Sequence, residues 1–270
     1  MDLKRVLAAG LTAAILSTTP ALAAGCGNGA PGFPGWLAQF KAEAPRYGLK
    51  PRVVESALSG VSYDSKVIRL DRSQHSFKLS FEQFYAKRVN NAMIKRGQQL
   101  RQSYAGVFRR IEQRYGVPAP ILLSIWGLET NYGGFSGNMP VLRSLATLAY
   151  DCRRSRFFTE ELVAALMIVQ RGDMRPSEMR GAWAGEIGQT QFLATNYVKY
   201  AVDFDRDGRR DLIRSSADAL ASTANYLKAH GWRAGQGWGP GTANHNVLKQ
   251  WNKATVYQKT IAVMASKIAQ

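Results

Sequence analysis

The most constraining feature of the sequence is an apolar stretch near the middle of the chain. Val117, Pro118 and Ala119 open it, and residues 121–128 are apolar nearly throughout. Proline suits the first turn of a helix, and a helix that is apolar all round is buried inside a protein. The sequence therefore predicts a buried helix that ends at the carboxyl group of Glu129.

The segments on both sides of this stretch also predict helices. Residues 34–58 and 64–115 are rich in helix formers with apolar residues at helical spacing, and glycines divide them into successive short helices. Strand signals are scarce, so we expect a mainly α fold with at most a small β-sheet. Ser216 is the expected N-terminal cap of one later helix. The later helices are predicted over residues 157–170, 216–230 and 255–269.

The first residues of the chain resemble an export signal rather than part of the fold. Lys4 and Arg5 precede an apolar run over residues 6–16, and small alanines follow this run. The run is about half as long as the ~20 residues of a membrane-spanning helix, and no later segment is longer and free of charges. We therefore predict a signal peptide over residues 1–24 and no transmembrane segment. Residues 25–270 are then exported to the periplasm as a single domain, with two lobes as the alternative.

Two cysteines, Cys26 and Cys152, leave two alternatives open. In the oxidising compartment outside the inner membrane they are expected to pair, which would tie the mature N-terminus to the middle of the chain. The alternative is a lipid anchor on Cys26, because residues 22–26 approach the lipoprotein pattern, although Ala23 stands where leucine is usual. Two cysteines and three histidines argue against a structural zinc site.

The chain carries a large excess of positive charge. It has 36 Lys and Arg residues against 19 Asp and Glu residues, which gives a formal net charge of +17. Such a surface attracts polyanions. Nucleic acid is not the expected partner, because the chain has no nucleic-acid-binding motif and is predicted to be exported. An anionic polymer outside the cytoplasm or an anionic membrane surface fits better, and a solvated surface without a dedicated partner is the alternative.

Glu129 is the strongest candidate for chemistry. In a helix it lies on the same face as Leu122, Ile125 and Trp126, at the end of the apolar stretch. Apolar surroundings and the negative end of the helix dipole both disfavour an ionised carboxyl group, so both raise its pKa. A carboxyl group with a raised pKa is suited to act as a general acid. An ion pair with one of the many arginines is the alternative.

A glycine-rich segment over residues 181–192 is the second candidate. Its glycines are expected to let the backbone approach a ligand closely, and Gln189 and Gln191 offer amides to hydroxyl and acetamido groups of a sugar. Taken together with Glu129 in its Glu-Thr-Asn-Tyr-Gly stretch, the Gly-Gln-Thr-Gln-Phe stretch at residues 188–192 resembles the lytic transglycosylases of the membrane-bound B type. The resemblance runs from about Trp36 to Ala262.

This resemblance implies a lysozyme-like α+β fold with a helical core, in which Glu129 is the catalytic acid and base. Many relatives carry serine where this chain has Ala182. A hydrogen bond to the acetamido group of the substrate is then either missing or supplied by Glu186. The other residues that the resemblance places along a saccharide cleft are Arg153, Arg154, Gln191, Tyr226, Trp251, Asn252 and Tyr257.

The resemblance also implies a reaction. Glu129 protonates the glycosidic oxygen between N-acetylmuramic acid and N-acetylglucosamine, and then takes the proton of the muramoyl C6 hydroxyl as a 1,6-anhydro ring closes. This needs no cofactor, and we expect a monomer that acts on peptidoglycan strands. Two alternatives stay open. One is an inverting muramidase in which Glu186 positions water, and the other is a non-catalytic protein that binds the cell wall.

An acidic segment predicts a structural calcium site. Asp203, Asp205 and Asp207 alternate before a glycine, as in a calcium-binding loop, and some members of the resembled family bind calcium here. The twelfth position of the loop, where glutamate is expected, is Arg214, so Asp211 or Asp218 would have to replace it. The alternative is that these acids pair with the neighbouring arginines, which are Arg206, Arg209 and Arg210.

Overall fold

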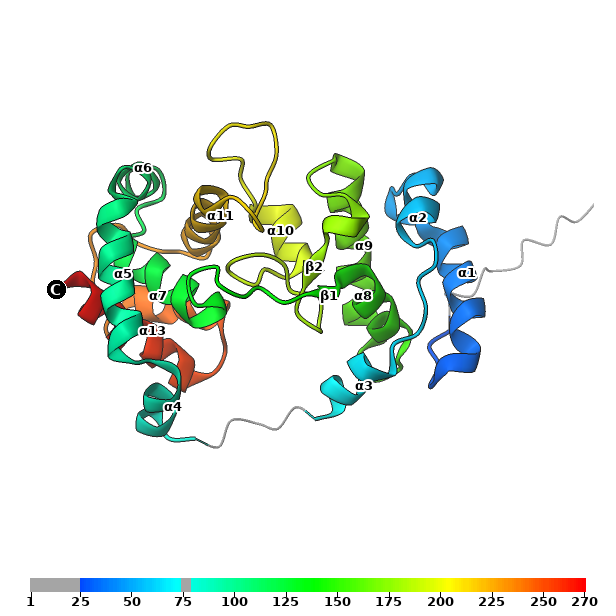
Figure 1. The fold of residues 1–270 in the computed structure, drawn as a ribbon, viewed down its shortest axis with the longest axis horizontal. Coiled ribbons are helices and arrows are strands. Elements are labelled where there is room, and N and C mark those ends of the chain that lie inside the picture. The colour runs from blue at the N-terminus through cyan, green and yellow to red at the C-terminus, as the bar shows by residue number, and fades with distance from the viewer. Residues whose placement is uncertain (1–24, 74–78) are drawn as a thin grey trace, which may run out of the picture.

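The computed structural model describes residues 25–73 and 79–270, so the predicted signal peptide lies outside the described residues. The described residues form thirteen α-helices and one two-stranded sheet, which confirms the mainly α prediction (Figure 1). Three short 3₁₀ turns cover Ala30–Gly32, Ala44–Tyr47 and Pro176–Glu178. The α-helices are α1 (Phe33–Glu43), α2 (Pro51–Ala57), α3 (Ser65–Arg72), α4 (Phe81–Arg88), α5 (Asn91–Ser103), α6 (Ala105–Tyr115), α7 (Ala119–Thr130), α8 (Val141–Tyr150), α9 (Ser155–Arg171), α10 (Ala194–Tyr200), α11 (Ser216–Ala229), α12 (Ala243–Trp251) and α13 (Thr255–Ala269).

Helix α7 is the buried helix that the apolar stretch predicts. Eleven of its twelve residues are buried, and Glu129 is the exception. The helix packs against α13, α5, α6 and α11, which together exclude water from its apolar surface. Its last turn closes on Asn131, which has a left-handed backbone with φ 51°. Burial of each leucine or isoleucine stabilises the fold by about 1.5–3 kcal/mol, so α7 anchors the helices around it.

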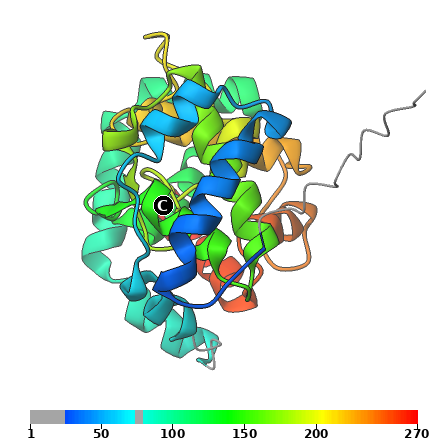
Figure 2. The ribbon, with the colours of Figure 1, turned by 90° about the vertical axis from the view of Figure 1, so that its right-hand side faces the viewer.

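The helices pack as two groups. The N lobe contains α1–α3 and α8–α10, and the C lobe contains α4–α7 and α11–α13. The packing of α10 against α11 joins the two lobes. Figure 2 views the molecule from the N-lobe end, where α1 lies over α8 and α2 over α9.

The small sheet positions two loops of the later site. Strand β1 (Met139–Pro140) pairs in antiparallel register with β2 (Arg180–Gly181). Strand β1 follows the loop after α7, and β2 opens the glycine-rich segment. The pairing therefore holds the end of the buried helix close to the glycine-rich segment, although the two are far apart in the sequence.

Three later helices agree closely with their predicted positions. Helices α9 and α11 differ from prediction by one or two residues at their ends, and α13 has the predicted bounds. The predicted cap of α11 was wrong by one residue. The hydroxyl group of Ser215, not of Ser216, accepts a hydrogen bond from the backbone N–H of Asp218. Ser216 is instead the first residue of the helix and donates its hydroxyl proton to Gln189.

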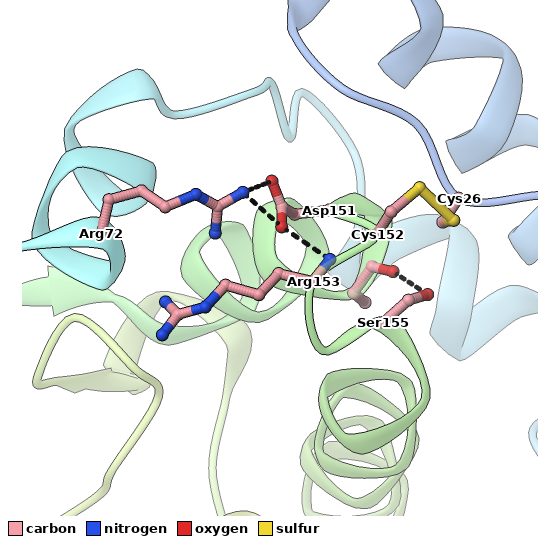
Figure 3. The surroundings of a disulfide bond; sticks show 7 residues. Cys26, Arg72, Asp151, Cys152, Arg153 and Ser155 are labelled. Atoms are coloured by element: carbon pink, nitrogen blue, oxygen red, sulfur yellow. Dashed lines mark hydrogen bonds and ion pairs between the residues drawn. A yellow bond between two sulfur atoms is a disulfide. The ribbon is translucent and has the colours of Figure 1, made fainter. Parts of the chain in front are cut away.

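Cys26 and Cys152 form a disulfide, which confirms the predicted pairing (Figure 3). The bond joins the first described residues to the turn between α8 and α9, across a sequence separation of 126 residues. Next to it, the backbone N–H of Gly27 donates to the carbonyl oxygen of Tyr150. Since both sulfur atoms are used, the thiol that a lipid anchor on Cys26 would need is not available in this state.

Candidate active site

Glu129 lies at the C-terminal end of α7 and is held by two side chains from the last helices. The indole N–H of Trp251 donates to Oε1 of Glu129 at 3.0 Å, and the hydroxyl group of Tyr257 donates to the same oxygen at 2.7 Å. Both hydrogen bonds reach the same oxygen, so Oε2 of Glu129 is the carboxyl oxygen that neither donor contacts.

The two donors are themselves fixed by aromatic packing. The ring of Trp251 meets the edges of Phe192 and Tyr226, with centroids 5.5 Å and 5.3 Å apart. The ring of Tyr257 packs on Phe84 of α4 at 6.0 Å. These contacts limit the rotation of both donors, so the orientation of the Glu129 carboxyl group is set before any substrate binds.

The surroundings of Glu129 favour its protonated form. Desolvation by the apolar core raises the pKa of Glu129, and this effect outweighs the hydrogen bonds from Tyr257 and Trp251, which lower it. The guanidinium group of Arg88 also lowers the pKa, because it lies nearby and donates to the carbonyl oxygen of Leu128 at 2.7 Å. Burial next to Glu129 also raises the pKa of Tyr257, so this hydroxyl stays a donor. The raised pKa of Glu129 agrees with the role predicted from the sequence.

A cavity of about 370 Å³ opens in front of Glu129. It lies where the lobes meet, because α7, α11 and α12 of the C lobe and α10 of the N lobe all contribute to it. Sequence reasoning did not single out Leu193, Asn196, Gln250 or Lys253, which carry no motif of their own. The lining residues are Glu129, Glu186, Gln191, Phe192, Leu193, Asn196, Tyr226, Gln250, Trp251, Asn252 and Lys253.

Glu186 is the second carboxyl group of this cavity. Its Oε2 is buried and has no hydrogen-bond partner among the residues that the structure describes. Desolvation raises the pKa of Glu186, against the opposing effect of backbone N–H donors at Glu186 and Ala184, and the negative charge of Glu161 raises it further. Buried polar atoms without partners are rare, so Oε2 is the atom that a bound ligand would satisfy.

Gln191 lines the cavity as predicted. Its side-chain amide donates to the carbonyl oxygens of Ser136 and Gly188, at 3.0 Å and 2.9 Å. Its backbone is in the left-handed region with φ 53°, a conformation that costs free energy in a residue other than glycine. The two amide contacts compensate for this strain and fix the side chain at the cavity wall.

Gln189 does not line the cavity, so the structure does not support its predicted contact with a sugar. Its side chain is 7% exposed, donates to the carbonyl oxygen of Ile213 at 3.0 Å and accepts from Ser216. Its backbone carbonyl accepts from the hydroxyl group of Thr130, the residue after Glu129, at 2.6 Å. Gln189 therefore ties the end of α7 and the glycine-rich segment to the acidic segment.

The glycines of this segment approach the protein itself rather than an open ligand site, which corrects the sequence interpretation. A Cβ at Gly185 would lie 2.3 Å from the side chain of Leu145, and one at Gly188 would lie 2.4 Å from the carbonyl oxygen of Leu212. Both residues also have positive φ angles, 89° and 79°. Glycine is needed at these positions because neither the space nor the backbone tolerates a side chain.

Arg153 and Arg154 lie on the N-lobe side and do not line the cavity around Glu129. Both pair with the buried carboxylate of Asp71, Arg153 at 2.6 Å. Arg72 bridges the same aspartate and Asp151, next to the disulfide (Figure 3). The positive charge of Arg154 nevertheless lowers the pKa of Glu186, so Arg154 has an electrostatic effect on the site without lining the cavity.

The acidic segment brings three carboxylates together. Oxygen atoms of Asp203, Asp205 and Asp218 lie within 4.8 Å of one another, which identifies Asp218 rather than Asp211 as the residue that completes the group. Asp211 instead pairs with Arg214 at 2.6 Å. Oxygen ligands at such spacing suit Ca²⁺.

Asp207 and Arg210, two further charged residues of this segment, have partners outside the group of three carboxylates. The carboxylate of Asp207 accepts from the backbone N–H of Arg209. Arg210 pairs with Asp173 of the loop after α9. Among the ion pairs of residues 25–73 and 79–270, none joins Asp203, Asp205 or Asp207 to Arg206, Arg209 or Arg210, so the alternative of local neutralisation is not supported.

A larger cavity of about 660 Å³ lies in the N lobe between α1, α9 and α10. Trp36, Phe40 and Met167 give it an apolar wall, and it contains neither Glu129 nor Glu186. The smaller cavity contains Glu129 and Glu186, whose pKa values are both raised. The hydrogen bonds from Trp251 and Tyr257 fix the Glu129 carboxyl group. Chemistry therefore belongs to the smaller cavity.

Comparison with known proteins agrees with this site. The transglycosylase SLT domain family matches residues 32–243. A curated relative, the membrane-bound lytic murein transglycosylase B of Escherichia coli, is 40% identical over 133 residues, which is 49% of this chain. The match spans 37% of that relative's length. In the part of the chain that the structure describes, no helix has the length and apolar character needed to cross a membrane.

Solved structures extend the similarity to most of the chain. SltB3 from Pseudomonas aeruginosa, in complex with NAG-anhNAM-pentapeptide, is 33% identical, with a TM-score of 0.82 over 88% of this chain and 79% of its own. The lytic transglycosylase Slt35 of Escherichia coli shares the fold at 24% identity, with a TM-score of 0.76 over 92% of this chain and 96% of its own. The lysozyme-like fold is therefore shared along nearly the whole described chain. The chain belongs to the transglycosylase SLT domain family and, as its motifs predicted, to the lytic transglycosylases that resemble the membrane-bound B type.

Proposed function

We propose that this protein is a peptidoglycan lytic transglycosylase that cleaves the β-1,4 bond between N-acetylmuramic acid and N-acetylglucosamine and leaves a 1,6-anhydromuramoyl end. The observation that carries the proposal is Glu129 in the cavity wall, with a pKa that burial raises and with Oε1 held by two donors. Family membership supports it, as does the complex of SltB3 with NAG-anhNAM-pentapeptide.

The first step is protonation of the leaving group. Oε2 of Glu129 gives its proton to the glycosidic oxygen, and the bond between this oxygen and C1 of the muramoyl sugar breaks with its electron pair going to the oxygen. The carbonyl oxygen of the sugar's 2-acetamido group stabilises the positive charge at C1. Glu129 is now a carboxylate, and the hydrogen bonds from Trp251 and Tyr257 stabilise that charge.

The second step closes the product ring. The C6 hydroxyl oxygen of the same sugar bonds to C1, and its proton passes to the Glu129 carboxylate. Glu129 thereby returns to its neutral form, and no water or external cofactor is consumed. A single carboxyl group suffices, because the substrate supplies its own nucleophile where hydrolases need a second acid residue.

The inverting muramidase is not favoured as the alternative. Such an enzyme needs a second carboxyl group that is ionised and can take a proton from water. Burial raises the pKa of Glu186, which works against that role. The non-catalytic alternative has no support in the site either, because the acid and both of its donors are intact.

We assign binding roles to the other cavity residues. Gln191, Tyr226 and Asn252 line the wall next to Glu129 and are proposed to contact the saccharide. Neutral Glu186 is proposed to donate from Oε2 to the acetamido group, in place of the serine that Ala182 replaces. Arg153 and Arg154 are proposed to act through Asp71 and the charge balance near Glu186, and Gln189 to position the site.

The product identifies the reaction. Purified protein is incubated with peptidoglycan in water enriched in heavy oxygen, and the released fragments are analysed by mass spectrometry. We expect 1,6-anhydro ends that contain no solvent oxygen and that weigh one water less than the products of a muramidase. Reducing ends that carry heavy oxygen as the main product would overturn the proposal.

We further propose a structural Ca²⁺ at Asp203, Asp205 and Asp218. The clustered carboxylate oxygens fit a hard cation, and Slt35, which shares the fold, was solved in complex with calcium. The ion would neutralise carboxylates that repel one another, and its role would be stability, since the cluster is separate from the residues that line the catalytic cavity.

The cellular setting follows from the proposed reaction. The substrate lies outside the inner membrane, so we propose a periplasmic protein whose disulfide forms there. We propose that it acts as a monomer, because one chain contributes the acid, both donors and the whole cavity wall.

A further inference from the structure

Positive charge is concentrated in the C lobe. Residues 79–132 and 216–270, which form this lobe, contain fourteen Lys and Arg residues and four Asp and Glu residues, a formal charge of +10. Two of these four acids, Glu129 and Asp218, face the interior. Residues 25–73 and 133–215 of the N lobe contain nineteen basic and fourteen acidic residues, a formal charge of +5. The two lobes therefore differ in charge balance as well as in position.

The basic residues of the C lobe are not neutralised within the protein. Every ion pair among the described residues lies in the N lobe. The basic side chains of the C lobe are all exposed. They are Lys87, Arg88, Lys95, Arg96, Arg101, Arg109, Arg110, Arg114, Lys228, Arg233, Lys249, Lys253, Lys259 and Lys267. We call these fourteen residues the basic surface. Like charges that crowd one surface raise the free energy of the folded protein until a partner neutralises them.

The basic surface extends far from the catalytic cavity. Of its fourteen residues, Lys253 is the one that lines that cavity. Helices α5 and α6 carry six of them and lie at the end of the molecule opposite α1 and α2 (Figure 1). A glycan strand bound in the cavity therefore does not explain the charge on these helices.

The shape of the basic surface points to a planar partner. A linear polyanion binds in a groove that follows its backbone, whereas these side chains are spread over the exposed faces of several helices. A plane of anionic headgroups contacts several exposed side chains at once, such as those of the neighbouring helices α5 and α6. Leu79, just before α4 of the same lobe, is an exposed apolar residue. The disulfide adds a second argument, because it uses the sulfur through which Cys26 could otherwise carry a lipid anchor.

We propose that the basic surface docks the protein onto a membrane that contains anionic phospholipids, with the catalytic cavity left uncovered. Electrostatic attraction to headgroup phosphates then takes the place of a covalent lipid. This inference is independent of the proposed reaction, since thirteen of the fourteen side chains lie outside the residues that line the catalytic cavity.

The test compares two triple variants with the same change in net charge. The C-lobe triple is Lys87→Glu, Lys95→Glu and Arg109→Glu, one residue on each of α4, α5 and α6, and none of these side chains forms a hydrogen bond or ion pair with another described residue. The control triple changes three exposed basic residues of the N lobe that also lack side-chain partners, and it is Arg46→Glu, Arg52→Glu and Lys66→Glu.

Binding is measured by co-sedimentation with vesicles of phosphatidylcholine alone, with vesicles that also contain phosphatidylglycerol, and with purified sacculi. We expect the wild type to bind the anionic vesicles, less at high salt, and not the neutral ones. The C-lobe triple should bind the anionic vesicles at least about tenfold more weakly, since each basic residue near a headgroup plane adds to the attraction. The control triple should bind them nearly as well as the wild type.

Other outcomes would overturn the proposal. No binding of the wild type to anionic vesicles would do so, as would equal weakening in both triples, which would show a net-charge effect. A C-lobe triple that loses sacculi but keeps vesicles would assign the surface to the cell-wall polymer instead. Turnover of soluble glycan fragments is expected to stay at the wild-type level in both triples, so a failure of the proposed reaction is seen separately.

Discussion

At the scale of single residues, the position of Glu129 determines its properties as an acid. Glu129 is the one residue of α7 that is not buried, and two donors meet one of its two oxygens. Desolvation outweighs the two donors, so the pKa of this carboxyl group is raised. In the proposed reaction the same two donors serve both steps, since they orient the acid first and stabilise the carboxylate afterwards.

Replacing the acid tests this directly. Glu129→Gln should fold normally and bind glycan, while turnover falls by about 100-fold or more, because an amide keeps the shape of the side chain but cannot donate an acidic proton. Thermal unfolding, glycan binding and product release measure the three properties. Turnover at the wild-type rate in this variant would show that another group is the acid.

Removal of one donor should move the pH profile. The Tyr257 hydroxyl lowers the pKa of Glu129, so Tyr257→Phe should raise this pKa. A general acid must be protonated, so kcat/KM falls as pH rises through its pKa, and the descending limb of the profile should move to higher pH. Trp251→Phe removes the second donor and should move it in the same direction. A limb that stays in place in both variants would show that Glu129 does not set it.

Glu186 should act as a neutral donor. Glu186→Gln keeps an N–H donor in place of Oε2, and we expect turnover close to the wild type. Glu186→Ala removes the donor, and KM should rise about tenfold with little change in kcat, as for the loss of one hydrogen bond to the substrate. If the glutamine variant is as impaired as the alanine variant, the ionised form of Glu186 is required, and the muramidase reaction regains support.

At the scale of elements, Gln189 connects three segments. Its backbone carbonyl receives the Thr130 hydroxyl proton from α7, and its side chain bonds Ile213 and Ser216 at the end of the acidic segment. These contacts connect the acidic segment to Thr130, the residue that follows Glu129. Variants of Thr130 and of Gln189 should be non-additive in stability, because the side chain of Gln189 fixes the position of the backbone carbonyl that accepts from Thr130.

Calcium should stabilise the acidic segment. We expect calcium chloride to raise the Tm of the wild type, as binding to the folded state alone requires, and a chelator to reverse the effect. Asp205→Asn removes one exposed carboxylate of the cluster and should abolish the increase. Magnesium chloride at the same concentration controls for ionic strength. An equal rise in Tm in the variant would exclude these carboxylates as the ligands.

The disulfide should contribute strongly to stability. A bond that closes a loop of 126 residues stabilises the folded chain by about 4–5 kcal/mol in the chain-entropy model. The double variant Cys26→Ser and Cys152→Ser should therefore unfold about 10 °C or more below the wild type. The single variants should resemble the double variant. Unfolding at the wild-type temperature in the double variant would show that the bond constrains little.

At the scale of the whole molecule, the helical segments predicted at residues 34–58 and 64–115 cover the helices α1–α6, whereas three short helices after α7 were not predicted. The sequence indicated α7, α9, α11 and α13, because each has a long apolar pattern. It did not indicate α8, α10 or α12, which have ten, seven and nine residues, because helices this short depend on tertiary packing.

The site was predictable to a similar degree. Glu129 stood out by its own context, and the resemblance supplied Gln191, Tyr226, Trp251 and Tyr257 as neighbours. The true position of Gln189 could not be derived, because its partners lie 59 and 24 residues away in the sequence. The same holds for the basic surface, since net charge is a property of composition and its separation into lobes is a property of the fold.

The interleaving of the two lobes sets the order in which the molecule can be assembled during synthesis. The C lobe is built from residues 79–132 and 216–270, so α7 emerges from the ribosome long before its main partner, α13. Both donors to Glu129 lie far after it in the chain, at sequence separations of 122 and 128 residues, so they are made much later. A chain released before Trp251 would leave the apolar surface of α7 uncovered and its acid unoriented, so incomplete chains are inactive as well as prone to aggregate.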